Sequence, residues 1–200
     1  MSKKRLAGER IEPFTVTTIH NEQRALPAQT DALWHLQFRR FAGCPVCNFH
    51  LRSFARELDR IRNANIHELI FFHSDAAQLL VHQDQLPFDV VADPEKEWYR
   101  HFGVSKSVRA VLDPRAWASG ARALASGLGD PATAQGGRLG LPADFLIDGS
   151  GVIVALKYGA HADDQWSIEE LLTHAQASRA SAQAPTQSDQ APHPRPRSSR

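Results

Sequence analysis

The sequence predicts an α/β protein with a mixed central sheet flanked by helices on both faces. Short apolar runs rich in branched and aromatic residues alternate with stretches in which apolar residues recur every three or four positions. Helical crossovers between strands make neighbouring strands parallel, whereas the Gly-Ser-Gly turn at 149–151 predicts an antiparallel hairpin. Together these patterns favour a sheet that combines both kinds of pairing.

The first half of the chain alternates strand and helix patterns. The first strand is short, apolar and aromatic, and it leads directly into a cysteine motif. The helix after it has apolar residues on one face and arginines mainly elsewhere. The expected elements are a strand at 33–39, a helix from Cys47 to Ile61, a buried strand at 66–73, a polar stretch at 74–85 and a strand at 88–91.

The second half begins with a helix start signal. Asp93 suits the N-cap of a helix, and Pro94 suits its first position, where the missing N–H costs nothing. The pair Asp113-Pro114 repeats the signal. The expected elements are a helix from Pro94 to Gly103, a helix at 117–128, an exposed mobile loop at 129–140, hairpin strands at 145–148 and 152–156, and a final helix at 165–176.

The length and composition predict one globular domain. The chain has 200 residues, of which 42% are hydrophobic, enough for one core and too few for a second full domain. We expect the domain to span 1–175, with a helical and loop insertion at 113–140. The segment 176–200 contains no Leu, Ile, Val or aromatic residue and is predicted to be a disordered tail.

The charge balance and the number of cysteines indicate which partners and which cellular compartment to expect. Lys and Arg number 23 against 22 Asp and Glu, so no global positive field favours nucleic acid or an anionic membrane as a partner. No segment approaches the length of a membrane span, and the basic residues at the amino terminus are not followed by an apolar run. The chain has only two cysteines, which indicates a reducing compartment, and we expect a cytoplasmic protein.

The motif Cys44-Pro45-Val46-Cys47 carries the predicted chemistry. A cysteine at the start of a helix faces unsatisfied N–H groups and the positive end of the helix dipole, both of which favour a thiolate. Arg39 and Arg40 add positive charge upstream, although strand alternation predicts that only one of them faces the site. We therefore expect Cys44 to attack and Cys47, one turn further in and more buried, to resolve the intermediate as a disulfide.

Two other interpretations of this motif remain open. His50 extends it to a Cys-x2-Cys-x2-His pattern that could form half of a zinc site, but no second ligand cluster is apparent and no metal or other cofactor is expected. The pair could also be inert. Elsewhere, Pro142 is most simply the entry residue of a strand, and His35 is most simply a packed core residue.

These residues resemble the thioredoxin-like superfamily, and more closely the peroxiredoxin-like proteins of its alkyl hydroperoxide reductase/thiol-specific antioxidant branch. The resemblance spans 11–175 and rests on residues 38–47, 87–94, 102–104 and 141–151. It implies a thioredoxin-like fold and a thiol-dependent oxidoreductase that reduces disulfides or peroxides. The implied partners are a thioredoxin- or glutathione-type reductant and the substrate, and a homodimer is a possible state.

The resemblance assigns a role to Pro142 and also exposes departures from the family. In thioredoxin-like proteins the matching proline is cis and lies against the CxxC motif, where it helps to hold the partner. In peroxiredoxins a proline and a Thr or Ser precede the reactive cysteine, and here Gln37 and Phe41 stand in those places. Pro142 also aligns with an arginine of those enzymes. The missing guanidinium could come from one of three other arginines: Arg39, Arg40 or Arg138.

A second class of function is compatible with the same residues. The chain could be a non-enzymatic redox sensor or binding module, in which the disulfide changes contacts made by the insertion at 113–140. The two hypotheses differ in whether the cysteines support catalytic turnover.

Overall fold

The computed structural model describes residues 3–104 and 140–183. The main sheet consists of five strands: β3 (Leu33–Phe38), β4 (Ile66–Phe72), β5 (Asp89–Ala92), β6 (Ala143–Ile147) and β7 (Ile153–Tyr158). Their order is β5-β4-β3-β6-β7. Strands β3, β4 and β5 pair in parallel, and β6 is antiparallel to both β3 and β7. The predicted mixed sheet is confirmed.

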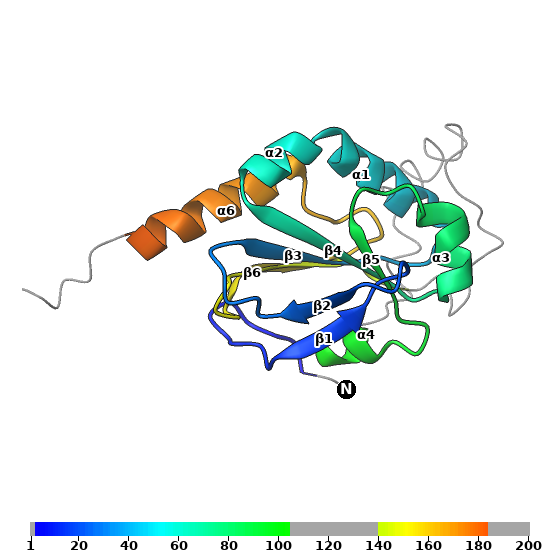
Figure 1. Cartoon of the computed structure of the whole chain (residues 1–200), viewed down its shortest axis with the longest axis horizontal. Coiled ribbons are helices and arrows are strands. Elements are labelled where there is room, and N and C mark those ends of the chain that lie inside the picture. The colour runs from blue at the N-terminus through cyan, green and yellow to red at the C-terminus, as the bar shows by residue number, and fades with distance from the viewer. Residues whose placement is uncertain (1–2, 105–139, 184–200) are drawn as a thin grey trace, which may run out of the picture.

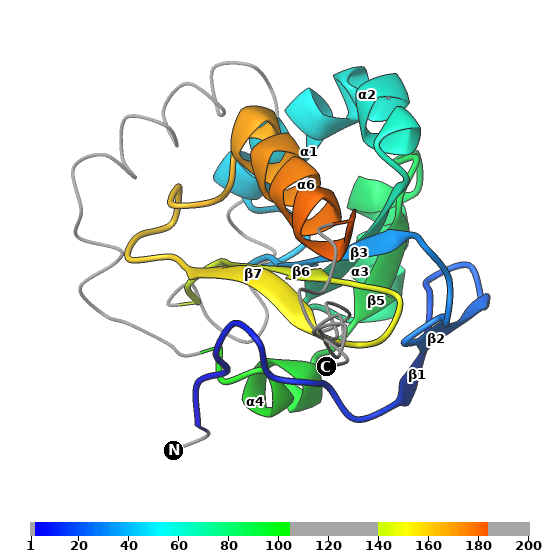
Figure 2. The same cartoon turned by 90° about the vertical axis from the view of Figure 1, so that its left-hand side faces the viewer.

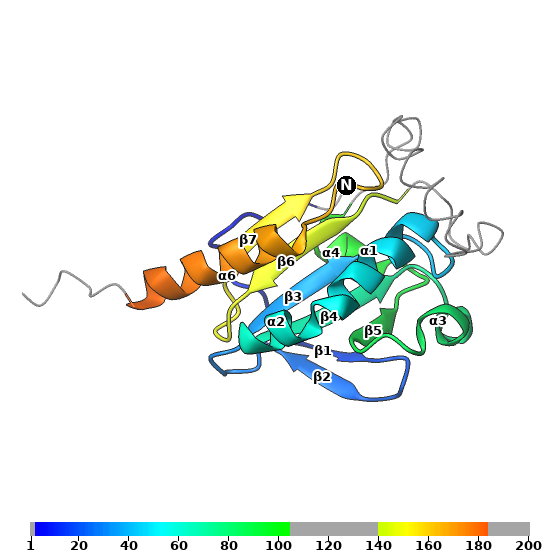
Figure 3. The ribbon, with the colours of Figure 1, turned by 90° about the horizontal axis from the view of Figure 1, so that it is seen from above.

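Helices cover both faces of this sheet, as predicted (Figures 1 and 2). One face carries three helices: α1 (Pro45–Arg56), α2 (Leu58–Asn63) and α6 (Ile168–Gln183). The other face carries α4 (Glu97–His101) and a hairpin of β1 (Phe14–Thr17) and β2 (Gln23–Leu26). A further helix, α3 (Ala76–Gln83), lies beside β5 (Figure 3). No helix in the described residues is long and apolar enough to cross a membrane.

Strand alternation divides the core into two apolar clusters, one on each face of the sheet. In β3, Trp34, Leu36 and Phe38 point to the face covered by α4 and the hairpin. There Phe38 stacks on Phe71 with ring centroids 4.8 Å apart. The opposite cluster, under α1 and α6, includes Phe54 of α1. On β3 the polar His35 and Gln37 face this second cluster, to which Leu33 also belongs.

Several boundaries differ from the predicted ones for local reasons. The predicted helix from Cys47 to Ile61 is broken at Glu57, which ends α1 and precedes α2. In the polar stretch at 74–85, the structure places α3, whose N-cap Asp75 accepts a hydrogen bond from the Gln78 N–H at 2.8 Å. The hairpin β1–β2 was not predicted. Its strands have only four residues each, too short for a clear alternating pattern.

The helix predicted to begin at Pro94 begins at Glu97. Lys96 has a left-handed backbone with φ of 58°, which interrupts a helix started at the proline. Asp93 nevertheless acts as the cap, because its carboxylate accepts hydrogen bonds from the N–H groups of Glu97 and Trp98 at 2.8 and 2.9 Å. The helix ends before Gly103, as predicted.

The last helix is longer than predicted and shifts the boundary of the domain. It begins with a reciprocal cap, in which Ser167 Oγ accepts from the Glu170 N–H and the Glu170 carboxylate accepts from the Ser167 N–H. It continues to Gln183, so 176–183 is helical and the prediction that disorder begins at 176 is wrong there. Alanine, a strong helix former, is frequent in this stretch. The predicted insertion at 113–140, except Gly140, and the tail at 184–200 lie outside the described residues.

Candidate redox site

Cys44 and Cys47 meet at the start of α1, directly after the loop that follows β3. Cys44 is the N-cap residue and Pro45 lies in the first turn, where its missing N–H leaves no bond unmade. The two sulfurs are 2.8 Å apart, within hydrogen-bond distance, and both cysteines are free and buried. The geometry therefore places two thiols where they can share a proton.

The pKa values of the two thiols fall in the opposite order to the expected one. Cys44 makes no side-chain cap hydrogen bond, and burial raises its pKa well above the usual value. Burial alone would also raise the pKa of Cys47. However, the hydrogen bond between the two sulfurs and the charges of Arg40 and Arg39 lower it to about 7. Of the two thiols, Cys47 therefore has the lowered pKa and Cys44 the raised one, the opposite of the order expected from their positions on the helix.

Both upstream arginines act on this site, although alternation predicted only one. Strand β3 ends at Phe38, so the alternation of a strand no longer holds at Arg40 in the following loop. Arg39 is completely buried, and its guanidinium donates to Asp144 Oδ1 at 2.6 Å. Arg40 is partly exposed and lies over the ring of Phe41 at 5.5 Å. The charges of both guanidinium groups favour a thiolate at Cys47.

A network of buried polar side chains lies on the same side of the sheet, and the sequence did not predict it. His35 Nδ1 is 2.8 Å from Glu68 Oε2, and His35 Nε2 is 3.2 Å from Asp144 Oδ1. Arg39 contacts Asp144 and also donates to Gln37 Oε1 from its Nε at 3.0 Å. Gln37 in turn donates to Glu68. His35, predicted as a packed core residue, is thus the centre of an ionic network.

The charges within this network shift one another's pKa values. Burial alone would lower the pKa of His35, but the charges and hydrogen bonds of Glu68 and Asp144 raise it to about 9. Burial alone would raise the pKa of Asp144, but Arg39 and His35 hold it well below its usual range. At neutral pH His35 is therefore a cation and Asp144 an anion, each neutralised by its neighbours.

His50 faces the network and not the two sulfurs. Its Nε2 lies 3.4 Å from an Arg39 guanidinium nitrogen, and burial together with the Arg39 charge lowers the His50 pKa well below its usual value. Among residues 3–104 and 140–183, no three His, Cys, Asp or Glu side chains are grouped as metal ligands. The Cys-x2-Cys-x2-His pattern thus does not form a ligand cluster in the described residues.

The expectation of a cis bond at Pro142 is wrong. In the described part of the chain the cis peptide bond is Leu26–Pro27, so the bond before Pro142 is trans. Pro142 is buried and its carbonyl accepts a hydrogen bond from the Gly159 N–H at 2.9 Å. A Cβ atom added at Gly159 would lie 2.7 Å from Pro142 Cγ. Pro142 therefore packs tightly against the chain that leaves β7.

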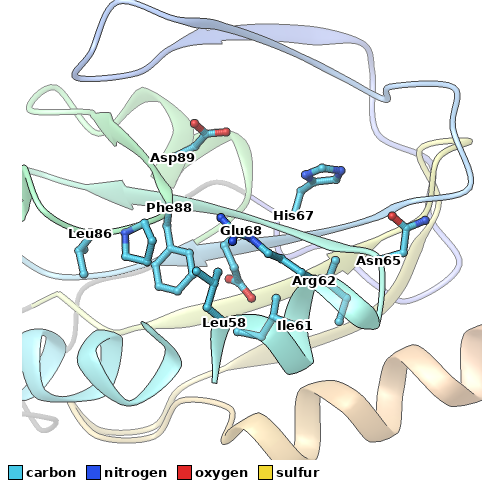
Figure 4. Close-up of a pocket in the computed structure, with 11 residues that line it drawn as sticks. Leu58, Ile61, Arg62, Asn65, His67, Glu68, Leu86, Phe88 and Asp89 are labelled. Atoms are coloured by element: carbon cyan, nitrogen blue, oxygen red, sulfur yellow. The ribbon is translucent and has the colours of Figure 1, made fainter. Parts of the chain in front are cut away.

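A pocket of about 430 Å³ lies apart from the two cysteines, between α2, β4 and β5 (Figure 4). Glu68 points from β4 toward Leu58 and Ile61 of α2, and neither cysteine lines this pocket. Glu68 Oε1 has no hydrogen-bond partner in the described structure, whereas Oε2 contacts His35. Glu68 thus joins the pocket to the buried network.

Comparisons with known proteins agree with this architecture. The AhpC/TSA family profile matches residues 7–156. No curated protein matches the sequence at a significant level. Peroxidoxin BcpB from Mycobacterium tuberculosis is a similar solved structure, with 13% identity and a TM-score of 0.62 over 86% of this chain and 96% of that one.

Two further solved structures are similar to this chain. Reduced 2-Cys peroxiredoxin from Plasmodium vivax shares 14% identity and a TM-score of 0.64, over 89% of this chain and 84% of that one. Mitochondrial 2-Cys peroxiredoxin from Plasmodium falciparum shares 14% identity and a TM-score of 0.63, over 90% and 97%. At this identity the likeness shows a thioredoxin-like fold of the peroxiredoxin type. Because the family profile covers most of the sequence, the chain belongs to the AhpC/TSA family of peroxiredoxin-like enzymes.

Proposed function

We propose that the chain is a dithiol oxidoreductase in which Cys44 and Cys47 alternate between dithiol and disulfide to reduce peroxides or disulfides. The observation that carries the proposal is the 2.8 Å approach of two free sulfurs beside two arginines. A thiolate is the reactive form of cysteine, and the neighbouring arginines and Cys44 lower the pKa of Cys47 to about 7. This reverses the order of attack expected from position on the helix alone.

With a peroxide, the Cys47 thiolate attacks one oxygen of the O–O bond. That bond breaks, and the other oxygen leaves as an alcohol or water after taking up one proton. The Cys47 sulfur becomes a sulfenic acid. Cys44 then loses its proton and attacks the Cys47 sulfur, the S–O bond breaks, and water leaves as the disulfide forms. The two electrons given to the peroxide come from the two sulfurs.

With a disulfide substrate, the same thiolate attacks one substrate sulfur and releases the other as a thiolate. Cys44 then attacks the mixed disulfide, so the protein is oxidised and the substrate is fully reduced. A thioredoxin- or glutathione-type thiol system, acting by the same exchange in the opposite direction, restores the dithiol. The scarcity of cysteines supports action in the cytoplasm, where such thiol systems operate.

Four other residues are proposed to support the pair. Arg39 and Arg40 stabilise the anion on Cys47. Pro45 fixes the first turn of α1 and so the direction of the two sulfurs. Pro142 precedes β6, the strand beside β3, and we assign it the role of shaping the edge at which a partner enters.

Steady-state turnover with a peroxide and with a small disulfide, each with a recycling thiol reductant, tests the proposal. Wild type should turn over at least one substrate, and Cys44→Ser and Cys47→Ser should each abolish recycling. Peroxide treatment of Cys44→Ser should leave a trappable sulfenic acid on Cys47. Arg52→Met, at an exposed position of α1, is the matched control and should retain activity. Reversible oxidation without any turnover would instead indicate a redox sensor.

A further inference from the structure

The face of the sheet under α1 contains a polar network within an otherwise apolar core. Three consecutive inward positions along and just beyond β3 are polar, and each has a partner on another element. All of its members except His50 are almost completely buried. The members are His35, Gln37, Arg39, Glu68, Asp144 and His50.

Stability does not explain such a network. Removing an ion from water costs several kcal/mol, and apolar side chains of similar volume are often as stable or more stable than a buried ion pair. Apolar partners are close at hand, because the His35 ring lies 5.5 Å from the Trp166 ring and 5.9 Å from the Phe54 ring. A purely structural requirement would therefore be met by extending the surrounding core.

The contacts of the network lead from the sheet to the cysteine helix. Asp144 on β6 holds the Arg39 guanidinium at 2.6 Å and also accepts a hydrogen bond from the Trp166 N–H at 3.2 Å. The guanidinium reaches His50 of α1 at 3.4 Å. His50 lies three residues after Cys47, on the same side of the helix. Arg39 is thus fixed between its counter-ion and the turn of α1 that carries Cys47.

We propose that Asp144 is a positioning residue of the redox site, which holds the Arg39 guanidinium under α1 and so sets how much negative charge the Cys44–Cys47 pair carries. This inference rests on the proposed function only in calling that pair the redox site. Asp144 touches neither sulfur in the contacts found, and it acts through Arg39. His35 and Glu68 keep the network neutral overall, since two cations face two anions.

The charges around Cys44 and Cys47 determine the direction in which each substitution should change the thiolate fraction. Arg39 and Arg40 favour the anion on Cys47, and burial opposes it. Three other described ionisable groups lie near the site or the network. Tyr99 is buried with a raised pKa, His50 has a lowered pKa, and Lys157 pairs with Asp164 at 2.9 Å.

Removing the charge of Asp144 and removing the charge of Arg39 should therefore change the thiolate fraction in opposite directions. Loss of the Asp144 charge leaves the Arg39 cation uncompensated and increases the thiolate fraction. Loss of the Arg39 charge leaves Asp144 with His35 as its remaining cation and decreases that fraction. A merely structural pair would instead lose stability in both variants, without an opposite change at the thiols.

The test is a titration of thiolate absorbance in reduced, full-length protein. At a pH below the first thiol transition, Asp144→Asn should raise the thiolate fraction about threefold and Arg39→Met should lower it about threefold, a half-unit pKa change in each direction. The double variant should return within about twofold of wild type. Arg52→Met is the control for loss of an arginine from this region and should leave the fraction unchanged.

Shifts in the same direction, or no shift in either single variant, would overturn the proposal. If Asp144→Asn does not fold, the double variant is compared with Arg39→Met, and it must show the larger thiolate fraction. An equal fraction there also overturns the proposal. Because thiolate is measured directly, these outcomes are independent of whether the cysteines support turnover. Absence of turnover with the expected opposite shifts would reject the proposed function and keep the positioning role.

Discussion

The stability of the reduced protein should rise between pH ~7 and ~8.5 because folding lowers the pKa of Cys47. Cys47 has a folded pKa of about 7, below the ~8.5 of a free cysteine. A group whose pKa is lowered by folding stabilises the fold fully above its unfolded pKa. That contribution is lost as the pH falls through the folded pKa. The relevant window is therefore pH ~7 to ~8.5.

Both cysteines contribute to the expected change in the free energy of unfolding. Lowering the pKa of Cys47 from ~8.5 to about 7 corresponds to about 2 kcal/mol at ~1.36 kcal/mol per pKa unit. At pH ~8.5, where an unfolded thiol is half ionised, the same linkage relation leaves most of this contribution. Cys44, whose pKa is raised, offsets part of it there. We expect a net gain of about 1 kcal/mol near pH ~8.5 and a decline at higher pH.

Urea unfolding under a non-thiol reductant measures this gain. The free energy of unfolding of wild type is compared across the pH range with that of the Cys44→Ser, Cys47→Ser double variant. The double variant retains His35, His50 and the carboxylates, so their titration largely cancels in the difference. A difference that is flat over this range, or that falls as pH rises, would refute the placement of a thiolate on Cys47.

Three further predictions concern the described fold. Phe38→Ala should cost about 3–5 kcal/mol in urea unfolding, because its ring is fully buried against Phe71; a cost below about 1 kcal/mol would contradict that packing. Arg24→Ala should cost less than about 1 kcal/mol and less still at high salt, because its ion pair with Asp89 is partly exposed; a larger cost would show that the pair is better shielded. His35 has a pKa raised to about 9, so its contribution to stability is present below pH ~6.5 and lost as pH rises through about 9; His35→Asn should flatten that alkaline decline.

Hydrophobic periodicity predicted most of the architecture. The strands around Leu36, Leu69 and Phe145 have short apolar runs, and a glycine turn separates the last two strands, so the mixed sheet followed from local patterns. The short hairpin β1–β2 and helix α3 were missed because strands of four residues and a helix of eight residues give weak periodic signals. The last helix extends beyond its predicted end because alanine favours helix even in a stretch of low hydrophobicity.

The candidate site was only partly predictable. The spacing of Cys44 and Cys47 on a helix predicted their approach, because three residues span about one turn. The order of their pKa values depends on burial and on the direction of Arg39, which no local pattern records. The partnership of His35 with Asp144 joins residues 109 positions apart, so it emerges only when β3 and β6 pair.

The central strand also carries a safeguard against mispairing. Its six residues are all buried, with Trp34, Leu36 and Phe38 on one face and Leu33 together with the polar His35 and Gln37 on the other. A slip of one residue against its neighbours would exchange these faces. His35 would then be driven among the rings of Phe71 and Phe145, and the carboxylates of Glu68 and Asp144 would be left facing hydrocarbon. The buried charged side chains on β3 and on its two neighbours therefore favour a single register of this strand in the sheet.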